Sequence, residues 1–206
     1  MLTIAFVTGT EPGKWFRRYE SPLTTIPSDD PFVEEATLAL MRLPDPRVTD
    51  DYHVVRLYDE AAGVAVPKDS IYVGERPTRE DLSDEIVNFS GHTPIDDLRS
   101  ALQVVAANVG IAYAPLPLLK NLAKKQVVPV ELDAKPETQI ALVWKKDDDS
   151  DAVQDFVGVA KGRTARSSRG SKQTLKTAGK REKTKPRQRK RSIRNHPRSG
   201  GRKRRS

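Results

Sequence analysis

The feature that most constrains how this chain can fold is an abrupt change of composition near residue 162. From residue 161 to its end, the chain carries 20 Lys and Arg residues and a single acid, Glu182, for a formal charge of +19. The residues before it hold the other 16 bases and 27 acids, for a formal charge of −11. One part is acidic and the other strongly basic, so we consider them separately.

The basic part has almost nothing to bury. Its large aliphatic residues are Leu175 and Ile193. Because ordering each residue costs roughly 1–2 kcal/mol, two side chains cannot offset the cost over such a length. We therefore expect residues 163–206 to form an intrinsically disordered Lys/Arg-rich tail.

The acidic part, residues 1–162, has the composition of a folded domain. It holds both Trp residues and every Tyr and Phe of the chain, which is enough for a hydrophobic core. The continuous apolar run Leu2–Val7 predicts a buried strand, and the segments after it mostly alternate between strand and helix patterns. This order predicts an α/β fold whose parallel or mixed sheet has helices on both faces.

The best-marked helix is expected at 94–109. Apolar residues recur there at steps of three and four, Thr93 is placed to cap the first turn, and Gly110 is placed to end the last one. We also expect Thr10 to cap a helix after the first strand. Further helices are expected from Asp29, over 78–82, over 116–124, and from Ser150 or Asp151 to about Gly162.

Several classes of protein are disfavoured by what the sequence lacks. The chain has no cysteine, which excludes disulfides, zinc–thiolate sites and thiol catalysis. Its N-terminus has neither a basic segment nor a cleavage site typical of secretion signals. The most apolar stretch, 104–123, is interrupted by Asn, Gly and Pro, so we expect no membrane span and a cytoplasmic location.

Two loops are candidates for ligand contact, because ligands of open α/β sheets bind beyond the carboxyl ends of the strands. Thr8, Gly9 and Thr10 follow the first strand, where hydroxyls and amides at a helix start suit a carboxylate or phosphate. The alternative is a turn in which Thr10 only caps the helix. The second loop, 88–93, precedes the best-marked helix and offers Asn88, Ser90, Gly91 and His92. Its alternative is a simple loop with a capping Thr93.

No catalytic or metal-binding constellation is evident. The three histidines are His53, His92 and His196, and no pair of them has the spacing of metal ligands. Asp147, Asp148 and Asp149 resemble a calcium loop only in charge. We therefore expect neither an enzyme nor a cofactor.

The tail is a candidate polyanion-binding segment. Its densest cations are expected to contact nucleic acid by releasing counterions, without sequence specificity. RNA, DNA, an acidic protein or the chain's own acidic part could attract it, and the plainer alternative is a solubilising tail without a partner. No aromatic residue occurs after Phe156, so base stacking is not available. The candidate contacts are Lys183, Lys185, Arg187, Arg189, Lys190, Arg191, Arg202, Lys203, Arg204 and Arg205.

A family resemblance adds to this interpretation. The segment Gly-Thr-Glu-Pro-Gly-Lys-Trp at 9–15 and the block at 104–115, VVAANVGIAYAP, resemble the effector-binding (substrate-binding) domain of LysR-type transcriptional regulators. The form is that common among actinobacterial sequences. The segments 38–44, 57–69, 141–144 and 156–169 are similar to further parts of that family. The resemblance covers about residues 1–169, and it does not include the family's N-terminal winged helix-turn-helix.

The resemblance implies a periplasmic-binding-protein-like bilobal fold of type 2. Two α/β subdomains, joined by crossing strands, would hold a small molecule in the cleft between them. Subdomain I would comprise 1–60 and 139–162, and subdomain II 61–138. The family's ligand-contacting loops map onto the two loops described above, and its proline after a strand maps onto Pro115. The second helix region, 28–35, is shorter than the family's.

We therefore expect a stand-alone effector-sensing domain of a LysR-type regulator, which binds a small carboxylate or other anion and forms a homodimer. The tail would bind DNA or RNA non-specifically. The alternative is a nucleic-acid-associated protein whose α/β domain is a protein-interaction scaffold. A solute receptor and an enzyme on the same fold are disfavoured, the first by the missing secretion signal and the second by the missing catalytic cluster.

Overall fold

The computed structural model describes residues 1–162. The expected tail at 163–206, with all its candidate nucleic-acid contacts, lies outside the described residues. The described part belongs to one compact unit. None of its helices is long and apolar enough to cross a bilayer.

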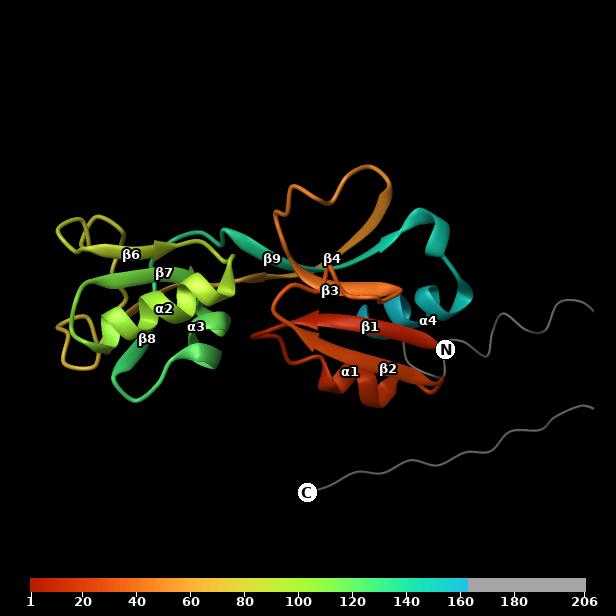
Figure 1. The fold of residues 1–206 in the computed structure, drawn as a ribbon, viewed down its shortest axis with the longest axis horizontal. Coiled ribbons are helices and arrows are strands. Elements are labelled where there is room, and N and C mark those ends of the chain that lie inside the picture. The colour runs from red at the N-terminus through yellow and green to blue at the C-terminus, as the bar shows by residue number, and fades with distance from the viewer. Residues whose placement is uncertain (163–206) are drawn as a thin grey trace, which may run out of the picture. The chain divides into compact units, whose positions relative to one another are not determined.

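The elements alternate largely as expected from the sequence (Figure 1). The predicted strand at the N-terminus and the predicted helices after Pro94, Pro115 and Ser150 are all present. In chain order the elements are β1 (Leu2–Val7), α1 (Gly13–Arg18), β2 (Leu23–Ser28), β3 (Leu38–Leu43), β4 (Tyr52–Glu60), β5 (Ala62–Pro67), β6 (Val87–Ser90), α2 (Ile95–Ala106), β7 (Ile111–Pro115), α3 (Leu116–Leu122), β8 (Val127–Glu131), β9 (Thr138–Lys145), a 3-10 turn (Lys146–Asp148) and α4 (Asp151–Ala160).

The strands form two mixed sheets. The first sheet has the order β2-β1-β3-β9-β4, in which β1 pairs in parallel with β2 and β3, and β9 runs antiparallel to β3 and β4. The second has the order β6-β7-β5-β8, in which only β6 and β7 are parallel. The chain crosses between the sheets twice, at Ala61 and over 132–137. The mixed α/β class is the one predicted from the sequence, whereas the domain limits stay a prediction. The expectation of helices on both faces was wrong, because the helices pack in one cluster on one face of each sheet, and the clusters on the other faces contain no helix residue.

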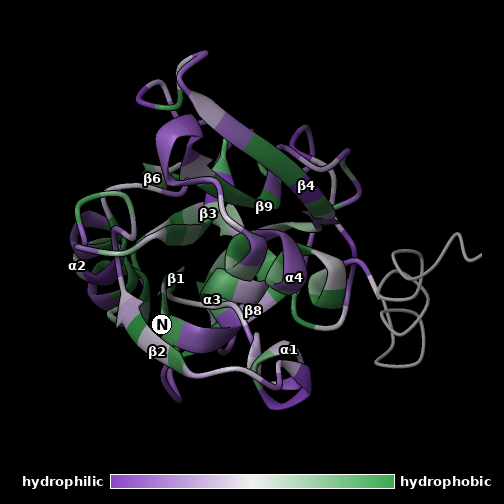
Figure 2. Ribbon diagram, turned by 90° about the vertical axis from the view of Figure 1, so that its right-hand side faces the viewer, coloured by the Kyte–Doolittle hydropathy of each residue, from purple (hydrophilic) through white to green (hydrophobic). Residues whose placement is uncertain are grey.

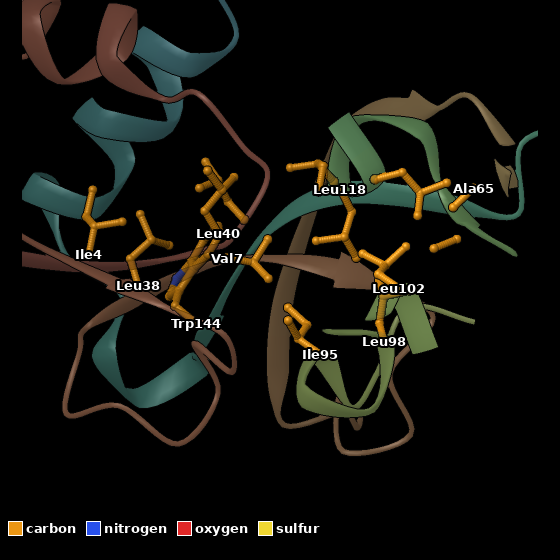
Figure 3. Packing of buried hydrophobic residues seen from close by; sticks show 14 of the residues in the cluster. Ile4, Val7, Leu38, Leu40, Ala65, Ile95, Leu98, Leu102, Leu118 and Trp144 are labelled. Carbon is orange, nitrogen blue, oxygen red and sulfur yellow. The ribbon is translucent and has the colours of Figure 1, made fainter. Parts of the chain in front are cut away.

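One hydrophobic core continues from the first sheet into the second. Val7, at the end of β1, lies between the side chains of the first sheet and those of Leu118 and Ile95 on the other side (Figure 3). Hydrophobic residues gather in the strands, whereas the edge strand β4 changes between hydrophobic and hydrophilic along its length (Figure 2). The end of β1 is therefore packed against α2 and α3, the helices that cover the second sheet.

Several local predictions were wrong. The segment from Asp29 and the segment 78–82 form turns rather than helices. The Thr10 hydroxyl donates to the Val7 carbonyl at 2.6 Å instead of capping α1. Thr93 does not cap α2 because the N-cap position is Pro94, one residue later. That helix ends at Ala106 rather than 109, since Asn108 and Gly110 adopt positive φ angles that end it early.

Candidate functional site

A pocket of about 200 Å³ lies where the chain crosses between the sheets. It opens beyond the carboxyl ends of β3, β6 and β7, which is where α/β folds place ligands. Its walls are largely apolar, and a few charged groups converge on them. The lining residues are Pro44, Glu60, Ala62, Gly63, Arg79, Gly91, His92, Tyr113, Ala114, Pro115, Glu137 and Thr138.

The buried side of the pocket is formed by the Glu60 carboxylate, whose charge is matched by Arg42. Arg42 Nε donates to Glu60 Oε2 at 2.8 Å and Nη2 donates to Oε1 at 3.0 Å. The Thr138 hydroxyl donates to Oε2 at 3.1 Å. Both charged side chains are almost fully buried, and burial is tolerable only because each is paired and hydrogen-bonded. Glu60 is thus already satisfied by the protein.

The exposed side of the pocket is closed by an ion pair between Arg79 and Glu137. Arg79 Nη2 lies 2.8 and 3.0 Å from the two carboxylate oxygens of Glu137. The guanidinium also lies 4.4 Å from the centre of the Tyr113 ring, a cation–π geometry. Burial raises the pKa of Tyr113 above its usual value, and the Arg79 charge opposes that rise. The Tyr113 ring and the Glu137 carboxylate thereby hold Arg79 over the pocket.

His92 stands at the junction of this pocket with a small neighbouring cavity. Burial lowers its pKa below 6.5, and the Arg42 charge lowers it further. Glu60, Asp45 and the carbonyl of Pro44 act in the opposite direction. Burial at this junction therefore disfavours the charged form of the imidazole.

A second ion pair joins the two sheets beside that small cavity. Asp29 follows β2 in the first sheet, and Arg99 projects from α2, which packs on the second sheet. Arg99 donates through Nη1 to Asp29 Oδ2 at 2.5 Å and through Nη2 to Oδ1 at 3.1 Å. The Thr8 hydroxyl donates to the same Oδ1 at 2.5 Å. The hydrogen bond from Arg99 is the largest cause that lowers the pKa of Asp29 below its usual value, and the bond from Thr8 acts in the same direction.

The loop after β1 is packed against α3, a helix that covers the second sheet. Gly9 has a φ of +87°, and a Cβ built there would lie 2.9 Å from Arg42 Nη2 and 3.0 Å from the Leu118 Cα. Arg42 Nη1 also donates to the Thr8 carbonyl at 2.8 Å. A side chain at position 9 would therefore clash with Arg42 and with the backbone of α3.

The residues predicted for the site do not all come together. Gly91, His92 and Pro115 line the pocket. Thr8 instead donates to Asp29, and Thr10 donates to the Val7 carbonyl. Gly9 lies against Arg42 and Leu118. Asn88 lies at the opposite end of the second sheet, where its side chain donates to the Val109 carbonyl at 2.7 Å, and Ser90 is an exposed residue at the end of β6.

The charged groups of the pocket were missed by the sequence interpretation. Arg79 and Glu137 are 58 positions apart, and Glu60 and Thr138 are 78 apart, so no local spacing links them. The one available signal was that Glu60 and Thr138 flank the two crossings between the sheets. Within residues 1–162, no group of three or more potential ligands could hold a metal ion.

Comparison with known proteins identifies what this fold resembles. Residues 87–165 match the LysR substrate binding domain family. A comparison with curated proteins gives no match. Among solved structures, the OxyR C206 mutant of Corynebacterium glutamicum is similar with a TM-score of 0.57 and 16% identity over 78% of this chain. The chain spans 62% of the length of that protein.

Two further structures show the same likeness. A putative LysR family transcriptional regulator from Pseudomonas aeruginosa has a TM-score of 0.60 and 14% identity, over 78% of this chain and 70% of its own. The BenM effector binding domain, solved with its effector benzoate, has a TM-score of 0.59 and 16% identity, over 78% of this chain and 90% of its own. The bilobal periplasmic-binding-protein-like fold implied by the resemblance is thereby confirmed.

Proposed function

We propose that this chain, a LysR-type substrate-binding domain, binds a small anionic effector in the pocket between its two sheets. The observation that carries the proposal is Arg79, whose guanidinium lies over the Tyr113 ring at the exposed side of a largely apolar pocket. Such a site recognises a carboxylate through the guanidinium and an apolar or aromatic body through its walls.

The acids that line the pocket are compatible with an anionic ligand. Glu60 is neutralised by its buried pairing with Arg42. Glu137 pairs with Arg79 at the surface, where the side chains are 62% and 41% exposed. An ion pair of that exposure is worth about 0–1 kcal/mol, so a ligand carboxylate that binds Arg79 from inside the pocket can replace it. Glu137 would then act as a weak internal competitor.

The size of the pocket favours a small ligand. The pocket of about 200 Å³ lies below the roughly 300–1,000 Å³ of pockets that hold drug-sized ligands. The effector named for the BenM domain, benzoate, is a carboxylate on an apolar ring. That example supports the same ligand class here. Binding would favour the closed arrangement of the two sheets, because groups from both line the pocket.

Thermal unfolding of the full chain with a panel of small carboxylates, each beside its neutral amide, tests the proposal. Benzoate with benzamide is the first pair. We expect a saturable rise in melting temperature for at least one carboxylate and none for its amide. The rise should disappear in Arg79→Ala and grow in Glu137→Gln, which removes the competitor.

Arg76→Ala is the matched control, because Arg76 forms an exposed ion pair with Glu131 but does not line the pocket. It should respond to ligands as the unaltered protein does. A panel in which no carboxylate shifts the melting temperature, or in which the Arg76 and Arg79 variants lose the shift equally, would contradict the assignment.

We also propose that the basic part of the chain binds DNA or RNA non-specifically. Its formal charge of +19 supports this proposal. Deleting residues 163–206 should abolish retention on DNA and RNA and leave the effector response intact. In the full chain, log affinity should fall with log salt by about 0.9 for each phosphate contacted on duplex DNA. Retention that survives the deletion would show that the domain itself binds nucleic acid.

A further inference from the structure

The Asp29 carboxylate accepts hydrogen bonds from two parts of the fold, the loop after β1 and the helix α2. The Thr8 hydroxyl reaches it from the end of β1, and the Arg99 guanidinium reaches it from α2 with both terminal nitrogens. A hydroxyl and a bidentate guanidinium are groups that would bind the carboxylate of a free ligand. Here the chain supplies that carboxylate itself.

The position of Asp29 is fixed from the side of the first sheet. The amide of Thr8 donates to the carbonyl of Ser28 at 3.0 Å, and the hydroxyl of Ser28 accepts from the amide of Asp30 at 3.1 Å. The turn that carries Asp29 is thus tied to the end of β1. Arg99 is held from the other side by Asp96, one helical turn earlier on α2. The Asp29–Arg99 pair is therefore a link between sheets, whereas the Asp96–Arg99 pair lies within one helix.

We infer that Asp29 acts as a built-in anion, which fills a carboxylate-binding set of donors between the loop after β1 and α2. It takes the place beside Thr8 and Arg99 that a small carboxylate would otherwise take. An external carboxylate can use these donors only when Asp29 is displaced or removed. The inference concerns a place other than the pocket under Arg79, and it holds whether or not that pocket binds an effector.

Chemical rescue of Asp29→Ala tests the inference. The substitution removes the carboxylate and leaves room for formate, which is the missing group. We expect formate to raise the melting temperature of the full-length variant saturably, compared with sodium chloride at equal ionic strength. The unaltered protein should not show this rise, because Asp29 fills the donors, and Asp29→Ala/Arg99→Ala should not show it, because the main donor is gone.

Asp96→Ala is the matched control, since it also removes an acid bonded to Arg99 but leaves the link between the sheets in place. It should show no rescue by formate. Hydrogen exchange supplies a second readout: amides of 8–10 and of α3 should exchange faster in Asp29→Ala and slow again with formate. Exchange should not change in Asp96→Ala. Asp29→Asn serves the same measurements if the alanine variant fails to fold.

The outcomes separate clearly. A formate effect confined to variants that lack Asp29 and retain Arg99 supports the built-in anion. An equal effect in all variants would identify a general salt effect and overturn the inference, as would the absence of any effect with unchanged exchange. Formate rescue does not involve Arg79 or Glu137. A missing formate effect would therefore contradict only the role of Asp29, and a carboxylate panel without shifts would contradict only the effector site.

Discussion

Arg42 and Glu60 form an ion pair with side-chain exposures of 2% and 1%, at the point where β4 leaves the first sheet for the second. Arg42 also donates to the Thr8 carbonyl, so one guanidinium joins the crossing strand to the loop after β1. The pair therefore connects the buried side of the pocket to the loop after β1.

Removing one partner of this pair should be strongly destabilising. Glu60→Gln leaves the Arg42 charge buried without a counter-charge, and we expect a loss of about 3–5 kcal/mol in the free energy of unfolding. Urea unfolding of the full chain measures it. The double variant Arg42→Met/Glu60→Leu removes both charges and should recover much of the loss. A double variant no more stable than the single one would show that the pair acts through geometry and not charge.

The close contact of Gly9 with Arg42 and α3 gives a prediction with an internal control. Gly74 has a similar φ of +89°, but a Cβ there would meet nothing within 4 Å. Gly74→Ala should therefore cost only the left-handed backbone strain, about 1–2 kcal/mol. Gly9→Ala adds overpacking against Arg42 and Leu118, so we expect about 3 kcal/mol or more. Equal losses in urea unfolding would contradict the close packing of this loop.

Much of the fold could be predicted because its signals are local. The apolar run Leu2–Val7 predicted the buried strand β1, and the spacing of Leu98, Leu102 and Val105 predicted the buried face of α2. The two wrong caps, Thr10 and Thr93, are also local features. In both cases the helix begins after a proline that itself occupies the N-cap position, so the preceding threonine lies too early in the chain.

The charged groups of the site could not be predicted in the same way. Asp29 and Arg99 are 70 positions apart and meet only because α2 packs against the end of β1. Thr8 was identified as a hydroxyl donor for a ligand anion, whereas in the structure it donates to Asp29. A residue type suited to an anion does not reveal whether the anion is a ligand or another residue of the chain.

The start of α4 offers a test of the one predicted cap that the structure retains. The Ser150 side chain accepts from the Val153 amide at 3.5 Å. Ser150→Ala should lower the free energy of unfolding by about 1 kcal/mol. Thr93→Ala should change it by less than about 0.5 kcal/mol, because Thr93 caps nothing. Both values come from the same urea titration, and a larger loss at Thr93 would contradict the position of the N-cap at Pro94.

His92 should give the protein a pH-dependent stability that a single substitution removes. Its pKa is lowered in the folded protein, mainly by burial, so the unfolded chain binds the proton more tightly. Stability linked to His92 is therefore complete above a pH of about 6.5 and falls as the pH drops below that value. His92→Gln should abolish this component. The difference in free energy of unfolding between the two proteins should rise from about pH 5 to about pH 7, measured by urea unfolding. A flat or falling difference would show that the imidazole is not buried at this junction.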